Sequence, residues 1–213
     1  MLYELRTYTL LPGTVGTYMK YHTELGRPIR GDNYGKLVGG WTTEIGPLNQ
    51  YVHLWQYENG LERERLRGEL AKNERWTKEY APKIRELMIK QESKSLILAP
   101  GATIRPPETG GNIYELRTYR TLAGKTNDWL KIFVEALQHR DKYTKCIGVW
   151  SADFGTVQEV CHLWAYPDLN ARQASRAQSL ADPGWQAFVG QSSKLLAEMH
   201  TQIMLPTATS PMQ

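Results

Sequence analysis

One short alternation of polar and apolar side chains occurs twice in the chain. YELRTY stands at Tyr3–Tyr8 and returns, letter for letter, at Tyr114–Tyr119. Aromatic and β-branched residues in such an alternation, followed by the turn residues Pro12 and Gly13, are typical of a β-strand. The pattern predicts a first strand over 3–10. Its exact recurrence indicates a duplicated domain.

The rest of the first copy gives five further elements. Apolar residues recur at helical spacing from about Thr14 to Ile29, which predicts a helix. Strands are predicted over 37–45 and 51–57, with a turn at Gly46–Asn49 between them. A second helix covers roughly 61–90 with an interruption near Asn73, and a last strand covers 92–98. The predicted order is β-α-β-β-α-β.

The second copy repeats these landmarks. Gly39-Gly-Trp41 corresponds to Gly148-Val-Trp150, HLWQY at His53–Tyr57 to HLWAY at His162–Tyr166, and Trp76 to Trp185. A stretch rich in proline and glycine separates the copies and suits a linker. The predicted organisation is a first repeat over 1–100, a linker over 101–112, a second repeat over 113–206 and a flexible tail over 207–213.

The β-α-β-β-α-β order predicts an α+β fold of two tandem ferredoxin-like repeats, each with an antiparallel sheet and both helices on one face. Leucine and valine suit the helix-covered face, so residues of opposite parity are assigned to the open face. In the first repeat these are Glu4, Arg6, Tyr8, Tyr51, His53, Trp55 and Tyr57; in the second they are Glu115, Arg117, Tyr119, His162, Trp164 and Tyr166. Two such faces, packed face to face as a pseudo-dimeric α/β barrel, would bury each other.

Composition narrows the class of protein. With 41% hydrophobic and 23% charged residues and no apolar run near the roughly eighteen residues of a membrane span, no membrane span is expected. The formal charge of +4 comes from bases mixed with acids, so no nucleic-acid partner is expected. The first strand begins at Tyr3, which leaves no room for a leader, and a cytoplasmic location is expected.

The two cysteines lie in the strands of one predicted hairpin. Its turn near Gly155 would place Cys161 opposite a position close to Trp150, too far from Cys146 for a disulfide. Both are expected to be reduced and to pack as small apolar residues.

His53 and His162 are the candidate catalytic bases, one in each repeat. A buried neutral histidine can act as a base or ligate a haem iron, or it can simply be a hydrogen-bonded core residue. Glu4, Arg6, Glu115 and Arg117 can hold an anionic ligand or form a buried ion-pair network. Tyr8, Trp55, Tyr57, Tyr119, Trp164 and Tyr166 can line a cavity or fill a core. No metal-ligand spacing occurs, so no metal is expected.

The motifs YELRTY, Gly-x-Trp, GPLNQ, HLWQY and Asp-Pro-x-Trp together resemble the NIPSNAP family over nearly all of residues 2 to 206. The resemblance implies the dimeric α+β barrel fold, whose members include cofactor-free monooxygenases, isomerases and haem-handling proteins. It also implies that bacterial members have no assigned reaction and that animal members are mostly mitochondrial.

Three functions remain open. The first is a binder of a small apolar or anionic molecule, or a cofactor-free enzyme, with its cavity between the two sheets, His53 or His162 as base and Arg6 or Arg117 as anion anchor. The second is a non-catalytic scaffold with a filled interior, assembling as a homo-oligomer. The third is haem binding. Since Tyr51 and Gln56 become Val160 and Ala165, the second repeat is expected to be the roomier one.

Burial of Arg6 gives a first testable expectation. Arg6→Ala would leave a buried carboxylate without its partner, at a cost of about 3 to 5 kcal/mol. The thermal midpoint of Arg6→Ala should therefore fall well below that of Lys90→Ala. Equal midpoints would contradict the burial of Arg6.

Overall fold

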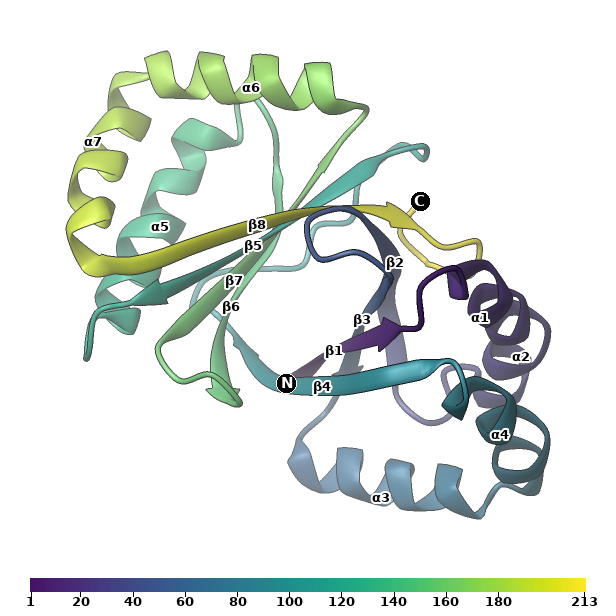
Figure 1. The fold of residues 1–213 in the computed structure, drawn as a ribbon. Helices are drawn as coiled ribbons and strands as arrows, with labels where there is room; N and C mark the ends of the chain where they lie inside the picture. Colours follow the sequence, from purple (N-terminus) through teal and green to yellow (C-terminus); the bar gives the residue numbers. More distant parts are fainter. The chain divides into compact units, whose positions relative to one another are not determined.

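The computed structural model describes residues 1–213, and these separate into two compact units. The first unit contains Met1–Ser95 and Leu205–Gln213, and the second contains Leu96–Met204. Both show the predicted β-α-β-β-α-β order and the predicted α+β class (Figure 1). No helix combines the length and the apolar composition that crossing a membrane would require.

The first repeat begins with strand β1, Leu2–Leu10, and a helical segment that includes a π-helical turn, His22–Gly26. After the β2–β3 hairpin a second helical segment follows, with a further π-helical turn at Arg75–Tyr80. The remaining bounds are α1 Val15–Tyr21, α2 Arg27–Arg30, β2 Lys36–Ile45, β3 Gln50–Tyr57, α3 Gly60–Lys72, α4 Ala81–Arg85 and β4 Met88–Leu98.

The second repeat has the same order with more regular helices. Its bounds are β5 Ile113–Thr121, α5 Thr126–Arg140, β6 Cys146–Phe154, β7 Glu159–Tyr166, α6 Leu169–Ala181, α7 Pro183–Ser192, a 3₁₀ turn Ser193–Leu195 and β8 Leu196–Pro206. The helix α7 starts where the sequence predicts, since the Asp182 carboxylate accepts from the backbone N–H groups of Gly184 and Trp185.

The central strands of the two repeats pair in the same antiparallel register. Arg6 stands opposite His53 between β1 and β3, and Arg117 stands opposite His162 between β5 and β7. The β6–β7 register places Cys161 opposite Trp150, as predicted, and both cysteines are free and buried.

The Gly-x-Trp motif on β2 and β6 has a steric cause. A Cβ atom at Gly39 would lie 2.2 Å from the Trp41 ring, and one at Gly148 would lie 2.5 Å from the Trp150 ring. Each indole therefore folds back over its own strand, and only glycine leaves room beneath it.

The helices cover the aromatic face of each sheet, which corrects the face assigned from the sequence. Tyr8 and Tyr51 pack against Tyr18, Tyr80 and Ile84 of the helical segments. In the second unit Tyr119 and Trp164 pack against aromatic residues of α5 and α7, which lie over that face of the sheet (Figure 1). The parity of the strands was correct, but the aromatic and charged side chains lie under the helices.

This correction has a physical reason. Leu5, Val52 and Leu54, on the opposite face, are buried too, so apolar character does not distinguish the two faces. The helices themselves carry the aromatic partners that select one face, because edge-to-face and offset ring contacts favour aromatic neighbours.

The two repeats differ by residues inserted in the helical segments of the first. Tyr18 and Trp129 occupy equivalent first-turn positions, since the backbone N–H of each donates to the carbonyl of the residue directly before its helix, Thr14 or Lys125. Arg30 and Arg140 are also equivalent, because each hydrogen-bonds the tyrosine that ends the third strand of its repeat. The first repeat has one residue more between these points, and the π-helical turn His22–Gly26 accommodates it.

The segments after the last strand of each repeat are packed. The backbone N–H of Ala99 donates to Val149, and that of Thr207 donates to Gly40, each at 3.0 Å. The Ser210 hydroxyl accepts from the Gly40 N–H, and Met212 is 3% exposed. The tail 207–213 thus belongs to the first unit and differs from the frayed tail predicted, because its apolar residue is buried.

Removing the tail contacts should destabilise the protein. Met212→Ala deletes a buried side chain, and we expect the free energy of unfolding in urea to fall by about 2 kcal/mol. Leu61→Ala, a comparable deletion at a 79% exposed position, should stay within about 0.5 kcal/mol of the parent. Equal effects of the two substitutions would show that the tail is not packed.

Candidate functional site

A buried ion-pair network lies beneath the helices in each unit. Glu4 pairs with Arg6 at 2.8 Å and accepts from the Ser93 hydroxyl and from Arg63 of α3. In the second unit Glu115 repeats the arrangement with Arg117, Arg172 of α6 and Thr201. Burial opposes ionisation of these carboxyls, yet the arginine hydrogen bonds and charges outweigh it and lower the pKa of Glu4 and of Glu115 to about 2.

The two histidines are held by tryptophans in the same strand. The Trp55 indole N–H donates to His53 Nδ1 at 2.6 Å, and the Trp164 indole N–H donates to His162 Nδ1 at 2.7 Å. An indole can only donate, so each Nδ1 is an acceptor and the proton of the neutral ring lies on Nε2. Burial, reinforced by the charges of Arg6 and Arg117, lowers the pKa of both imidazoles well below the ordinary value.

The Nε2 atoms of both histidines are buried without a hydrogen-bond partner. Each histidine is 3% exposed, so water does not solvate these N–H groups in bulk. An orphan donor of this kind costs about 1 to 3 kcal/mol. The role open to each histidine therefore depends on whether the space beside its Nε2–H can admit an acceptor.

An arginine at the end of the first helical segment of each repeat was missed by the sequence reasoning. The Arg140 guanidinium is buried, donates to Ser175 at 2.9 Å and to the Tyr166 hydroxyl at 3.1 Å, and lies over the Trp164 ring. Arg30 is placed in the same way over Trp55, 3.4 Å from the ring centroid. A basic residue ending an apolar helix stripe in both repeats was the available signal.

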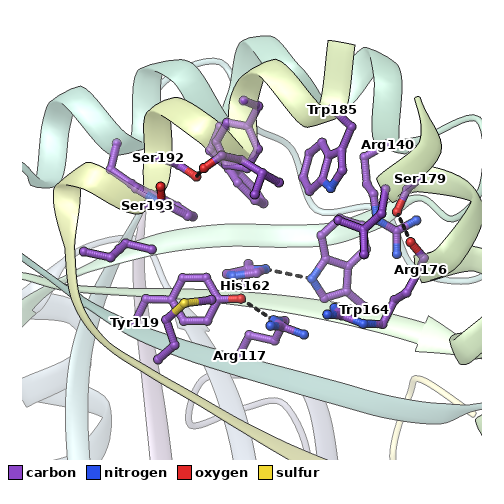
Figure 2. A pocket seen from close by; sticks show the side chains of 17 residues that line it. Arg117, Tyr119, Arg140, His162, Trp164, Arg176, Ser179, Trp185, Ser192 and Ser193 are labelled. Carbon is purple, nitrogen blue, oxygen red and sulfur yellow. Dashed lines mark hydrogen bonds between the residues drawn. The ribbon is translucent and has the colours of Figure 1, made fainter. Parts of the chain in front are cut away.

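A cavity of about 190 Å³ lies between the sheet and the helices of the second unit. Figure 2 shows His162 at its floor, with Trp164 hydrogen-bonded beside it and Trp185 across from it. Aromatic rings dominate the walls, and no carboxylate lines them. The lining residues are Arg117, Tyr119, Trp129, Phe133, Arg140, His162, Trp164, Arg176, Ser179, Leu180, Trp185, Phe188, Val189, Ser192, Ser193, Leu196 and Met199.

The corresponding cavity of the first unit is only about 30 Å³, room for a water molecule or two. Tyrosine and histidine side chains fill the space. The Tyr51 ring stacks on His53 with centroids 4.4 Å apart, and its hydroxyl is 3.1 Å from His22 Nε2. Tyr80 closes the other side and is 3.2 Å from His22 Nδ1; glycine at position 26 leaves room for the Tyr80 ring.

Serines on α6 and α7 explain why the second unit is open. Ser179 is 2% exposed at the helical position where the first repeat has the equally buried Leu70. Ser192 likewise stands where the first repeat has Ile84, and both hydroxyls donate to carbonyls of their own helix. The second repeat is the roomier one, as the sequence indicates: Tyr51, whose ring fills the first cavity, is replaced by Val160, which does not extend into the second cavity.

The predicted site residues divide into lining and supporting groups. In the second unit Arg117, Tyr119, His162 and Trp164 line the cavity, while Glu115 and Tyr166 hold Arg117 and Arg140 from behind. In the first unit Tyr8, His53 and Trp55 line the small cavity, whereas Glu4, Arg6 and Tyr57 do not. The sequence reasoning missed the helix side of the site, which is Trp129, Phe133, Arg140, Arg176, Trp185 and Phe188.

The predicted position of the cavity between the two sheets does not hold for these residues, because they face the helices of their own unit. Haem ligation does not fit either histidine. A haem-ligating Nε2 must present a lone pair, but in this arrangement Nε2 carries the proton because the indole occupies Nδ1. No cluster of three acidic, histidine or cysteine side chains is arranged to hold a metal ion.

The lowered pKa of Glu115 has a measurable consequence. Its folded-state pKa of about 2 lies below the ordinary glutamate value of 4.5, so its stabilisation is complete above about pH 5 and is lost as the pH falls toward 2. Glu115→Gln should reduce the slope of unfolding free energy against pH in this range. The remaining slope comes from Glu4, which has the same lowered pKa. Glu198→Gln, at an exposed position, should keep the parental slope. If Glu115→Gln kept the slope of the parent protein, the lowered pKa assigned to Glu115 would be contradicted.

Comparison with known proteins identifies the family. The NIPSNAP family model matches residues 3–103 and 114–211. The chain is 33% identical over 217 residues to human protein NipSnap homolog 2, covering all of this chain and 75% of that protein. It is 29% identical over 220 residues to Drosophila melanogaster protein NipSnap, covering all of this chain and 79% of that protein.

Two solved structures share the fold over nearly the whole chain. One, from Fusobacterium nucleatum, is provisionally described as a monooxygenase and has a TM-score of 0.70 at 10% identity, covering 100% of this chain and 97% of its own. Another, from Lactobacillus acidophilus, has the same provisional description. Its TM-score is 0.69 at 9% identity, and the match covers 97% of this chain and 94% of its own. These likenesses concern the fold alone. With both repeats matched by the family model and whole-chain relatives at such identity, the chain belongs to the NIPSNAP family.

Proposed function

We propose that the cavity of the second unit binds a small, flat, largely apolar molecule that carries an accepting oxygen. The observation that carries the proposal is the orphan N–H of His162. It is fully buried, belongs to a neutral ring of fixed tautomer and lies on the wall of an open cavity. A ligand oxygen at this point would satisfy a donor that the protein leaves unpaired.

A second orphan donor supports the same proposal. The indole Nε1 of Trp129 is buried without a partner, and Trp129 lines the same cavity. Its ring centroid lies 5.8 Å from that of His162. The first repeat has Tyr18 at the equivalent position, so the unpaired indole donor occurs only in the open repeat.

The walls favour a flat apolar body. Trp129 stacks on Phe133 with centroids 4.6 Å apart, and Phe188 contacts both rings edge to face. Trp185 extends this surface at 4.6 Å from Phe188. Aromatic side chains gain from offset and edge contacts with a further ring, so an aryl or similar conjugated ligand suits the space.

Arginines favour negative charge on the ligand. Arg140 and Arg176 line the cavity, and neither forms an ion pair with a carboxylate. Glu115, the nearby carboxylate, is engaged by Arg117 and Arg172. An anionic ligand group would therefore offset a local excess of positive charge.

In this proposal His162 is a hydrogen-bond donor instead of the base expected from the sequence. Its Nδ1 lone pair is occupied by Trp164, and no carboxylate lines the cavity. Cofactor-free oxygenation, which the resemblance implies for relatives, requires removal of a proton by a base. The proposal is therefore confined to binding, and the filled first unit serves as the structural half of the pair.

Filling the cavity tests the proposal. Ser179→Leu installs the residue that the first repeat has at this position, so it should leave stability unchanged or raise it slightly while excluding the ligand. Binding of 2-naphthoate, followed by quenching of tryptophan fluorescence, should weaken at least tenfold. Gln178→Leu, one residue away and exposed, should bind like the parent.

The donor is tested by a matched pair. His162→Phe keeps a ring but removes the N–H, and should weaken 2-naphthoate binding by about tenfold, as loss of one hydrogen bond to a charged group implies. His53→Phe makes the same change in the closed unit and should have no effect. The proposal fails if the parent binds neither 2-naphthoate nor 2-naphthol, or if Ser179→Leu binds them as the parent does.

A further inference from the structure

We propose that this cavity takes a phenol or enol in its deprotonated form, as the oxyanion, in preference to the neutral hydroxyl form. The inference rests on the proposed binding function and specifies its ligand class. It follows from the kind of polar groups that the cavity presents, from the charges around them and from their positions.

The buried polar groups without partners are both donors. His162 presents Nε2–H and Trp129 presents Nε1–H, and neither atom can accept a hydrogen bond in this arrangement. A neutral hydroxyl must also place its own proton on an acceptor. The lining offers only hydroxyl and thioether acceptors, on Tyr119, three serines and Met199, and no carboxylate. An oxyanion needs donors alone, so it matches the site better.

The charges in and around the cavity are predominantly positive. Arg117 on β5, Arg140 on α5 and Arg176 on α6 line it, and the ion pair of Glu115 and Arg172 lies behind them. Tyr119, Tyr166 and His162 are the uncharged titratable groups. On α7 no residue titrates, Asp182 at its N-terminus is paired with Lys142, and Glu198 and His200 on β8 are partly or largely exposed and paired. One carboxylate thus stands against four guanidinium groups.

The positive charges act at the position of the orphan donor. Besides burial, the charges of Arg117, Arg176 and Arg140 each contribute to lowering the pKa of His162, with Glu115 opposing them. The same field that disfavours an imidazolium favours an anion at this place. Arg176 is the least committed of the three, since it forms no ion pair and is only partly buried.

The arrangement is polarised along the cavity. In Figure 2 the side chains of Arg117, Arg140 and Arg176 lie toward one end, and Ser192 and Ser193 lie at the other, with His162 between them. A ligand oxygen near His162 would therefore face the arginine side, while its rings contact the aromatic side chains that line the cavity. This orientation distinguishes the site from a simple apolar pocket.

The proton balance is simple. When a neutral phenol binds as its oxyanion, its O–H proton passes to bulk water and no covalent bond of the protein changes. Binding should consequently release a proton at pH values below the ligand's own pKa, and the pKa of the bound ligand should be lower than that of the free ligand.

The probe for this inference is 4-nitrophenol, whose neutral and ionised forms have different absorption spectra. Titrating the probe with and without saturating full-length protein gives its pKa in each state. We expect the bound value to lie at least one unit below the free value, which corresponds to at least tenfold tighter binding of the phenolate. Arg176→Gln should raise the bound value again, whereas Arg67→Gln, the equivalent change in the closed unit, should not.

Each outcome is decisive. A bound probe whose pKa equals that of free 4-nitrophenol overturns the oxyanion preference but leaves the binding function standing, provided that Ser179→Leu still excludes the probe. A lowered pKa that persists in both Ser179→Leu and Arg176→Gln locates the effect elsewhere and also overturns the inference. If the protein binds neither 4-nitrophenol nor 2-naphthoate, the inference and the proposed function are both contradicted.

Discussion

The structure depends on satisfying polar groups on a sheet face that helices seal from water. Each repeat places a carboxylate, an arginine and a histidine at alternate positions of its central strands, where an unpaired ion or donor is costly. The carboxylate is held by two arginines and a hydroxyl, and the histidine by the indole two residues away. These pairings fix the ring orientation and tautomer of the histidine, and hence which atom is left to face the cavity.

Duplication allowed the two halves to diverge around the same framework. The first repeat closes its interior with Tyr51, Tyr80 and leucine or isoleucine on its helices, and uses a π-helical turn to bring His22 between the two tyrosine hydroxyls. The second repeat has a regular helix and buried serines instead. Each exchange of Leu70 or Ile84 for serine removes apolar volume without creating an unpaired hydroxyl, because the serine bonds to its own helix. The two repeats therefore share the buried ion pairs and the histidine–tryptophan hydrogen bonds, and they differ in the side chains that fill the space beneath the helices.

Much of the fold could be predicted from the sequence because its signals are local. Alternation, turn residues and the internal repeat give the element order, the hairpin register near Gly155 and the free cysteines. The face of the sheet that the helices cover could not be predicted from local signals. Tyr8 and Leu5 lie on opposite faces and are both apolar and buried, and the aromatic residues of the helices determine that the face of Tyr8 is the covered one. The sheet half of the site, including Arg117, Tyr119, His162 and Trp164, was found by parity. The helix half was not, because Trp129, Arg140 and Trp185 read as ordinary packing until their distances to the sheet are known.

His162 is a neutral, buried donor at Nε2 in an open cavity, while His53 is its closed counterpart. The most direct measurement is ¹⁵N–¹H NMR of the imidazole rings, which reports tautomer and charge at each histidine. We expect both rings to remain neutral, with the proton on Nε2, at a pH equal to the ordinary pKa of histidine, and only the His162 Nε2–H resonance to shift when 2-naphthoate is added. A charged ring, a proton on Nδ1 of His162, or a shift confined to His53 would contradict it.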